Sequence, residues 1–168
     1  VYTPYPAWTD GYPDWADPAN AGKVLPLQPN ADGWHWLQGD APVQGRLWGG
    51  CIEVLEFLKG TPYWPSSSAF WSERILFFET SEEKPTVQQV RHMLRNYGMQ
   101  GILGEVRGIL FGRPKGYSQD EKRQLHETIL QVLGEEFGRE DMLVVSNVDF
   151  GHTDPQLVLP LGGLMVID

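Results

Sequence analysis

Residues 74–79 read Arg-Ile-Leu-Phe-Phe-Glu, an apolar run of strand length that ends on a carboxylate. A helix is predicted to follow over Thr86–Tyr97, where apolar residues recur at helical spacing and Gly98 marks the end. Two further apolar runs, Glu105–Phe111 and Met142–Asn147, predict strands on either side of the longest helix, Ser118–Phe137. Strands that alternate with helices indicate βαβ units, so we expect an α/β fold with a mostly parallel central sheet.

The flanking elements complete an expected order of β-α-β-α-β-α-β-β-β. Upstream, Val43–Trp48 is predicted to be a strand that closes at Gly49-Gly50, and Cys51–Lys59 is predicted to be a helix. Downstream, Leu157–Pro160 and Leu164–Ile167 are predicted to be two more strands, separated by glycines. This strand-rich tail suggests a mixed or two-layered sheet.

Residues 1–42 differ in composition from the rest of the chain. They show neither a helical nor a strand period, and we expect a loop-rich, Trp- and Pro-rich segment packed on a domain that spans residues 43–168. The tryptophans either cover a core or line a binding cleft. All seven lie in the first 71 residues: Trp8, Trp15, Trp34, Trp36, Trp48, Trp64 and Trp71.

Composition excludes several classes of protein. The chain has 168 residues, 41% of them hydrophobic, which is enough to bury a core in a single domain. Its net charge of −9 and its pI near 4.8 argue against binding to nucleic acid or to an anionic membrane. No apolar run approaches the ~20 residues of a membrane helix. The single cysteine, Cys51, excludes an internal disulfide and suits a reducing, cytoplasmic compartment.

Two residues at strand ends could carry chemistry. Glu79 ends the apolar run 74–79, and His152 follows the strand predicted at Met142–Asn147 in the turn-forming sequence Gly-His-Thr-Asp. Because reactive groups gather beyond the carboxyl ends of parallel strands, the two side chains could lie within hydrogen-bond reach. A carboxylate that accepts from one imidazole nitrogen leaves the other nitrogen free to act as a base, which is two-thirds of a nucleophilic triad.

The other three histidines are weaker candidates for a catalytic role. His92 and His126 lie among polar neighbours in predicted helices and are expected to be solvated, while His35 is expected to pack between Trp34 and Trp36. No metal-binding histidine spacing occurs, and no phosphate-binding loop follows the glycines, so no metal and no cofactor are expected.

No residue of the chain is a convincing nucleophile. Ser118 stands three residues before Glu121 at the start of the longest helix, a spacing that predicts a capping box rather than a nucleophile elbow. Ser66, Ser67 and Ser68 form a polar loop with nothing to activate them. Cys51 follows Gly49-Gly50 at a helix start, but lone cysteines are mostly buried and inert.

An ordered set of motifs, taken together, resembles a known family. It consists of Gly45-Arg46-Leu47-Trp48-Gly49-Gly50-Cys51, Gly60-Thr61-Pro62-Tyr63-Trp64-Pro65, Ile75-Leu76-Phe77-Phe78-Glu79, Arg91 with Gly98, Gly108-Ile109-Leu110-Phe111-Gly112-Arg113 and Gly151-His152-Thr153-Asp154-Pro155. The set is similar to the C-terminal half of the L,D-carboxypeptidase family of serine peptidases. That family includes muramoyltetrapeptide carboxypeptidases and microcin C immunity peptidases, and the opening segment is closer to the second branch.

The resemblance implies a three-layer β/β/α swivelling-type fold. It also implies that Glu79 orients the imidazole and His152 is the general base, while the serine lies on an N-terminal nucleophile domain that we expect to be absent from this chain. The chain alone is then expected to be inactive. Joined to that domain, it would help to cleave murein tetrapeptides of peptidoglycan recycling or related peptide conjugates, without a cofactor.

We expect Gly49, Gly50, Trp34, Trp36 and Lys115 to contact the peptide or muropeptide substrate. Lys115 stands where the microcin-immunity branch is expected to carry an acidic residue, so a substrate with a carboxylate is favoured over one with an amine. Two other interpretations stay open: a Trp-rich module that binds glycan or peptide without catalysis, and a homodimer formed through exposed apolar surface.

Overall fold

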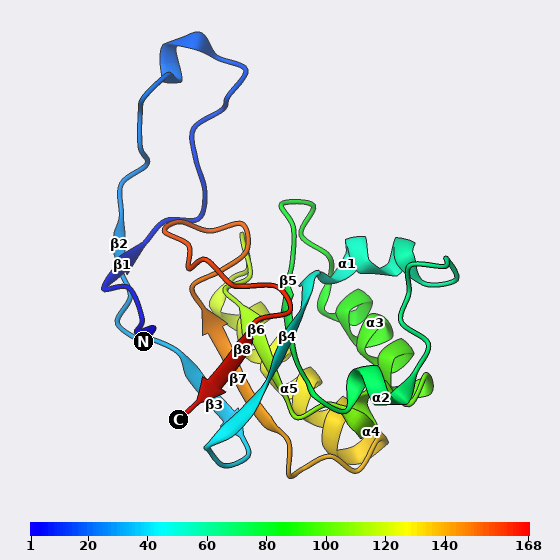
Figure 1. Ribbon diagram of the computed structural model, residues 1–168. Coiled ribbons are helices and arrows are strands. Elements are labelled where there is room, and N and C mark those ends of the chain that lie inside the picture. Colours follow the sequence, from blue (N-terminus) through cyan, green and yellow to red (C-terminus); the bar gives the residue numbers. More distant parts are fainter.

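The computed structural model, which describes residues 1–168, contains a curled six-stranded sheet (Figure 1). Its strand order is β3-β7-β6-β5-β4-β8. The four central strands are parallel: β4 (Val43–Cys51), β5 (Arg74–Glu79), β6 (Gly108–Gly112) and β7 (Leu143–Val148). The two edge strands, β3 (His35–Gln38) and β8 (Leu164–Ile167), are antiparallel to their neighbours. The expected α/β fold with a mostly parallel central sheet is thus confirmed.

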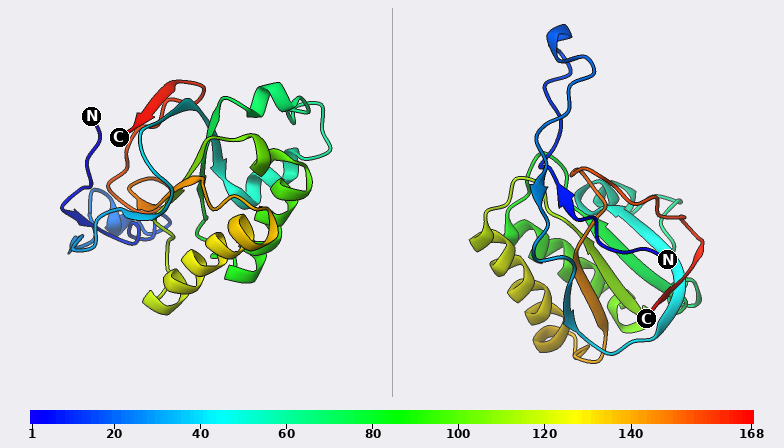
Figure 2. Two further views of the ribbon diagram at one scale, coloured as in Figure 1. Left: turned by 90° about the horizontal axis from the view of Figure 1, so that it is seen from below. Right: turned by 90° about the vertical axis from the view of Figure 1, so that its left-hand side faces the viewer.

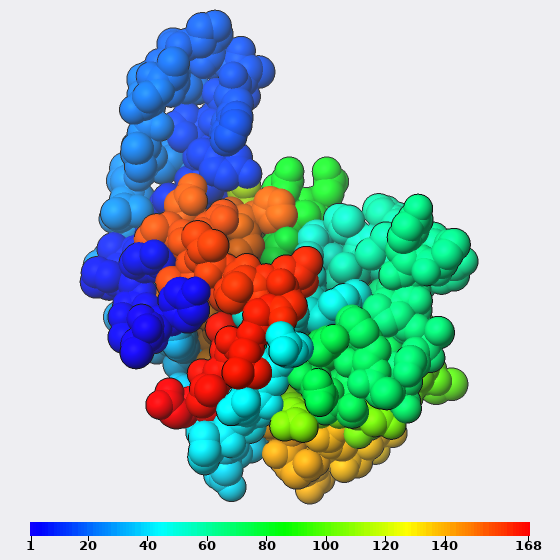
Figure 3. Space-filling model, in the orientation of Figure 1, coloured from blue at the N-terminus to red at the C-terminus, as the bar shows by residue number.

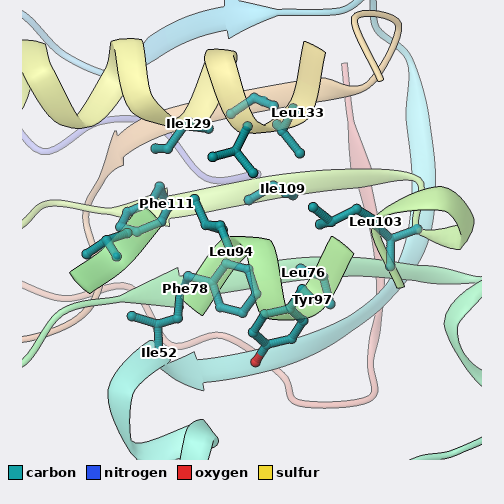
Figure 4. Close-up of a cluster of buried hydrophobic side chains, with 14 of the residues drawn as sticks. Ile52, Leu76, Phe78, Leu94, Tyr97, Leu103, Ile109, Phe111, Ile129 and Leu133 are labelled. Atoms are coloured by element: carbon teal, nitrogen blue, oxygen red, sulfur yellow. The ribbon is translucent and has the colours of Figure 1, made fainter. Parts of the chain in front are cut away.

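Helices cover one face of this sheet (Figure 2). The two long helices are α3 (Val87–Met99) and α5 (Gln119–Leu130), and α5 continues into a π-helical turn, η3 (Gln131–Glu136). The short elements are α1 (Ile52–Leu55), η2 (Glu56–Leu58), α2 (Ser68–Trp71) and α4 (Ile102–Glu105). Between helices and sheet lies a core of 20 buried side chains, part of which Figure 4 shows. None of these helices combines the length and the apolar character that a membrane-spanning segment requires.

Several element boundaries differ from the expectations. Residues 105–111 do not form one strand: α4 ends at Glu105 and β6 begins only at Gly108. Leu157–Pro160 is not a strand, because it runs as coil that bonds to Asp149 at one point, and proline has no N–H for a ladder. The predicted loop 1–42 supplies β3 to the sheet, an element that its mixed composition had not indicated.

Gly98 does not end α3. The helix continues to Met99, and the left-handed turn falls at Gly101, with φ of 76°. Gly98 is instead the point where α3 meets the Phe137 ring, because a Cβ there would overlap the ring atoms. The sequence signal for a helix stop was therefore a signal for close packing.

We expect Gly98→Ala to destabilise the fold by about 1–3 kcal/mol, the usual cost of adding a methyl group to a filled core. Gly104→Ala is the matched control, because it also lies in a helix but has no atom within 4 Å of its added Cβ. Urea unfolding of both variants measures the difference. Equal midpoints for the two variants would contradict the contact with Phe137.

The second face of the sheet is covered by the two ends of the chain. A smaller core of seven buried residues lies there, against partly buried side chains that include Trp34, just before β3, and residues of β8 and of the segment that leads to β8. The N-terminal segment forms a two-stranded ribbon of β1 (Ala7–Trp8) and β2 (Gln28–Pro29). Beyond the first residues after β1, the chain between these strands stands clear of the body as an arm that carries the short helix η1 (Pro18–Asn20), seen in blue in Figures 1 and 3.

Candidate functional site

The carboxyl ends of the parallel strands bring several functional side chains to one edge of the sheet. Glu79 is the last residue of β5 and pairs in register with Cys51, the last residue of β4. His152 lies four residues beyond β7, in a loop that turns back over this edge. Three parallel strands thus contribute to one site, as expected for this kind of sheet.

Glu79 and His152 are hydrogen-bonded. Nδ1 of His152 lies 2.7 Å from Oε2 of Glu79. Gly151 allows this approach, because its φ is 106° and a Cβ there would come within 2.8 Å of the Glu79 Cβ. A residue with a side chain at position 151 would therefore clash with Glu79, which explains why a glycine precedes the histidine.

The electrostatics of Glu79 are set by burial. Its side chain is only 10% exposed, and desolvation raises its pKa, although the hydrogen bond from His152 opposes this effect. The nearby carboxylate of Glu53 adds to the rise. Glu79 is thus a desolvated carboxylate that accepts a hydrogen bond from the imidazole, with the Cys51 thiol also next to it.

A second carboxylate, which the sequence did not single out, faces the other ring nitrogen. Oε2 of Glu82 lies 2.9 Å from Nε2 of His152. The pKa of Glu82 is lowered, first by a hydrogen bond from its own backbone and then by the charge of His152, with a smaller contribution from Lys115. Its position in an acidic loop was visible in the sequence, but its direction toward His152 was not.

A buried ion pair holds the loop that carries His152. Arg113 follows β6 and Asp149 follows β7; both side chains are fully buried and paired with each other. The second Asp149 oxygen accepts from the Trp34 indole at 2.8 Å and from the backbone N–H of Tyr5 at 3.1 Å. This pair was missed, although a charged residue at the end of an apolar strand is the signal that identified Glu79.

The N-terminal segment is hydrogen-bonded to the loop that carries His152. Thr9 and Asp154 exchange backbone hydrogen bonds of 2.7 and 3.1 Å, and the Trp8 ring lies 4.7 Å from the Arg113 guanidinium. Asp10 accepts from the backbone of Gly116 at 2.9 Å. Both ends of the His152 loop are therefore tied to residues near the start of the chain.

The expected substrate-binding residues fall into two groups. Gly49 and Gly50 lie at the end of β4 beside Glu79, and Lys115 lies in the loop after β6 at the same edge. Trp34 and Trp36 do not join them, because they line an apolar groove on the second face of the sheet, together with residues of β8. Trp36 is half exposed there, whereas the Trp34 indole N–H donates a hydrogen bond to Asp149.

The candidate nucleophiles within the chain are occupied or inactive. The Ser118 hydroxyl accepts a hydrogen bond from the Glu121 backbone N–H at 3.2 Å, and the Glu121 carboxylate accepts one from the Ser118 backbone N–H at 2.7 Å. The predicted capping box is therefore confirmed. Burial raises the pKa of the Cys51 thiol to about 12, with the Glu79 charge adding to the effect, so a thiolate is disfavoured. The geometry therefore offers a hydrogen-bonded carboxylate–imidazole pair, without an activated nucleophile beside it.

His126 is not solvated, contrary to the expectation. Its Nε2 lies 2.9 Å from the Ser146 hydroxyl, and its ring packs edge-on against His35 at 5.2 Å. Burial, with the charges of His35 and Lys122, lowers the pKa of His126 from 6.5 to about 4. The helical spacing placed His126 beside the inward-facing Leu125, but the neighbour on β7 could not be read from sequence.

We expect this histidine to make the fold sensitive to acid. The unfolded chain takes up a proton at His126 near pH 6.5 and the folded chain only near pH 4, so stability present above pH 6.5 is lost as the pH falls toward 4. Urea midpoints between pH 7 and pH 5 should fall less in His126→Gln than in the wild type. His92→Gln, at an exposed site, should keep the wild-type slope; equal slopes in all three proteins would contradict the assignment.

Comparison with known proteins shows the family to which the chain belongs. The family model for the LD-carboxypeptidase C-terminal domain matches residues 44–167. A carboxypeptidase-like protein of Synechocystis sp. is 30% identical over 164 residues, which cover 93% of this chain and 49% of that protein. The microcin C7 self-immunity protein MccF of Escherichia coli is 27% identical over 170 residues, which cover 100% of this chain and 45% of that protein.

A solved structure agrees with these matches. The MccF-like protein of Streptococcus pneumoniae, crystallised with AMP, superposes with a TM-score of 0.82 at 26% identity. The superposition covers 99% of this chain and 50% of that one. The chain thus spans about half the length of the relatives it matches.

Proposed function

This chain belongs to the family of LD-carboxypeptidase C-terminal domains, and we propose that it supplies the general base and the orienting carboxylate of a serine carboxypeptidase. The observation that carries the proposal is the 2.7 Å contact between Nδ1 of His152 and Oε2 of Glu79 at the carboxyl edge of the sheet. The serine would come from a nucleophile domain in the part of the relatives that this chain does not span.

The proposed chemistry uses each ring nitrogen of His152 once. Glu79 accepts a hydrogen bond from the Nδ1–H of His152, which fixes the tautomer whose lone pair is on Nε2. Nε2 takes the proton of the serine hydroxyl as its oxygen attacks the scissile carbonyl, and returns that proton to the leaving amine when the amide bond breaks. Water then repeats the cycle on the acyl-enzyme and restores the serine. Glu79 stabilises the imidazolium formed in each half-reaction.

We propose as substrates amides that end in a D-residue, as in murein tetrapeptides, or related peptide conjugates. MccF itself has been solved with aspartyl sulfamoyl adenosine and with glutamyl sulfamoyl guanosine, which supports the conjugate class. Lys115, at the same sheet edge as His152, would favour a substrate with a carboxylate.

Reconstitution tests the proposal. The chain alone should hydrolyse neither a murein tetrapeptide nor an aminoacyl sulfamoyl adenosine, whereas fusion to a family nucleophile domain should release the terminal amino acid or the free sulfamoyl nucleoside. Chromatography of the products measures both reactions. Hydrolysis by the unfused chain would contradict the proposal, because the chain would then contain its own nucleophile.

A further inference from the structure

Glu82 occupies the side of the His152 ring on which the proposed reaction takes place. Its Oε2 lies 2.9 Å from Nε2, while Glu79 holds Nδ1 at 2.7 Å. Ionised carboxylates can only accept hydrogen bonds, so an imidazole bound by both must donate from both nitrogens. A ring in that state has no lone pair with which to take a proton.

We propose that Glu82 is a displaceable cap on His152. It takes the place of the nucleophile on Nε2 while the nucleophile domain is not seated, and it turns away when the serine arrives. The inference rests on the proposed function, because Nε2 has a reacting partner only there. It adds a specific contact that keeps His152 from acting as a base before the serine is in place.

The structure gives the two carboxylates different freedom. The Glu79 side chain is 10% exposed at the end of a strand, whereas the Glu82 side chain is 56% exposed on a loop. That loop is fixed on both sides of Glu82: the Ser81 N–H donates to Glu53 at 2.8 Å, and Lys84 pairs with Glu121 at 3.0 Å. The Glu82 side chain can therefore rotate away without unfolding its loop.

Acylation of the ring by diethyl pyrocarbonate tests the cap on the chain as it stands. The reagent reacts only with an unprotonated, accessible ring nitrogen. Because Nδ1 is held by Glu79, Nε2 is the nitrogen that can react. We expect Glu82→Ala to raise the acylation rate of His152 several-fold, as measured by mass spectrometry of its peptide. Glu82→Gln should give a smaller rise, because the amide keeps the volume of the cap but not its charge.

Glu83→Ala is the matched control, because Glu83 is the exposed neighbour in the same loop. It should leave the rate unchanged, and the His92 peptide provides an internal reference in each sample. A Glu82→Ala rate equal to the wild-type rate would overturn the cap, as would an equal rise in Glu83→Ala. The measurement needs no nucleophile domain, so failure of the cap and failure of the peptidase assignment give different results.

Discussion

His152→Ala is expected to abolish hydrolysis by the fused, two-domain enzyme. Loss of the general base of a triad lowers turnover by about 10⁶-fold, because the serine keeps its proton. Glu79→Gln should cost about 10⁴-fold, since the amide no longer fixes the tautomer that leaves Nε2 as the acceptor. Single-turnover rates on the better of the two substrates measure both effects, with KM changing much less than kcat.

The control is His92→Ala, which removes an exposed histidine from α3 and should retain wild-type turnover. Binding of the substrate to the His152→Ala enzyme separates chemistry from assembly. A variant that binds substrate but does not cleave it supports the role of a base. Near-normal turnover in His152→Ala would exclude the proposed mechanism.

Asp149→Asn is expected to destabilise the chain by about 3–5 kcal/mol, the usual cost of removing one partner from a buried ion pair. The reason is that Arg113, fully buried, would keep its charge without an opposite charge beside it. Only Nη2 of Arg113 contacts Asp149, and Nε and Nη1 have no hydrogen-bond partner. Urea unfolding at pH 7 measures the loss.

Two comparisons make this prediction specific. Asp141→Asn breaks the pair with Arg139, in which Asp141 is 73% exposed, and should cost at most about 1 kcal/mol. The double variant Arg113→Met/Asp149→Leu should be more stable than Asp149→Asn, because it leaves no buried charge unpaired. If Asp149→Asn were as mild as Asp141→Asn, the pair could not be what holds the His152 loop.

The proximity of Glu79 and His152 could be predicted because it follows from order along the chain. Each residue ends or follows an apolar strand, and parallel strands place their carboxyl ends at one edge. The same reasoning correctly assigned Ser118 to a helix cap, since the spacing to Glu121 is a local signal. It failed at Gly98, because the partner of that glycine, Phe137, lies 39 positions away and no local pattern indicates it.

The parallel strands, the two long capped helices and the strand ends near which Glu79 and His152 lie could all be predicted from the order of residues, because periodicity and capping depend on near neighbours along the chain. Only the folded arrangement shows that Glu82 faces Nε2 of His152, that Asp149 joins Arg113 to Trp34, and that Trp34 and Trp36 lie on the other face of the sheet. These contacts join residues from separate elements, and the direction of a side chain across such a gap depends on how whole elements pack.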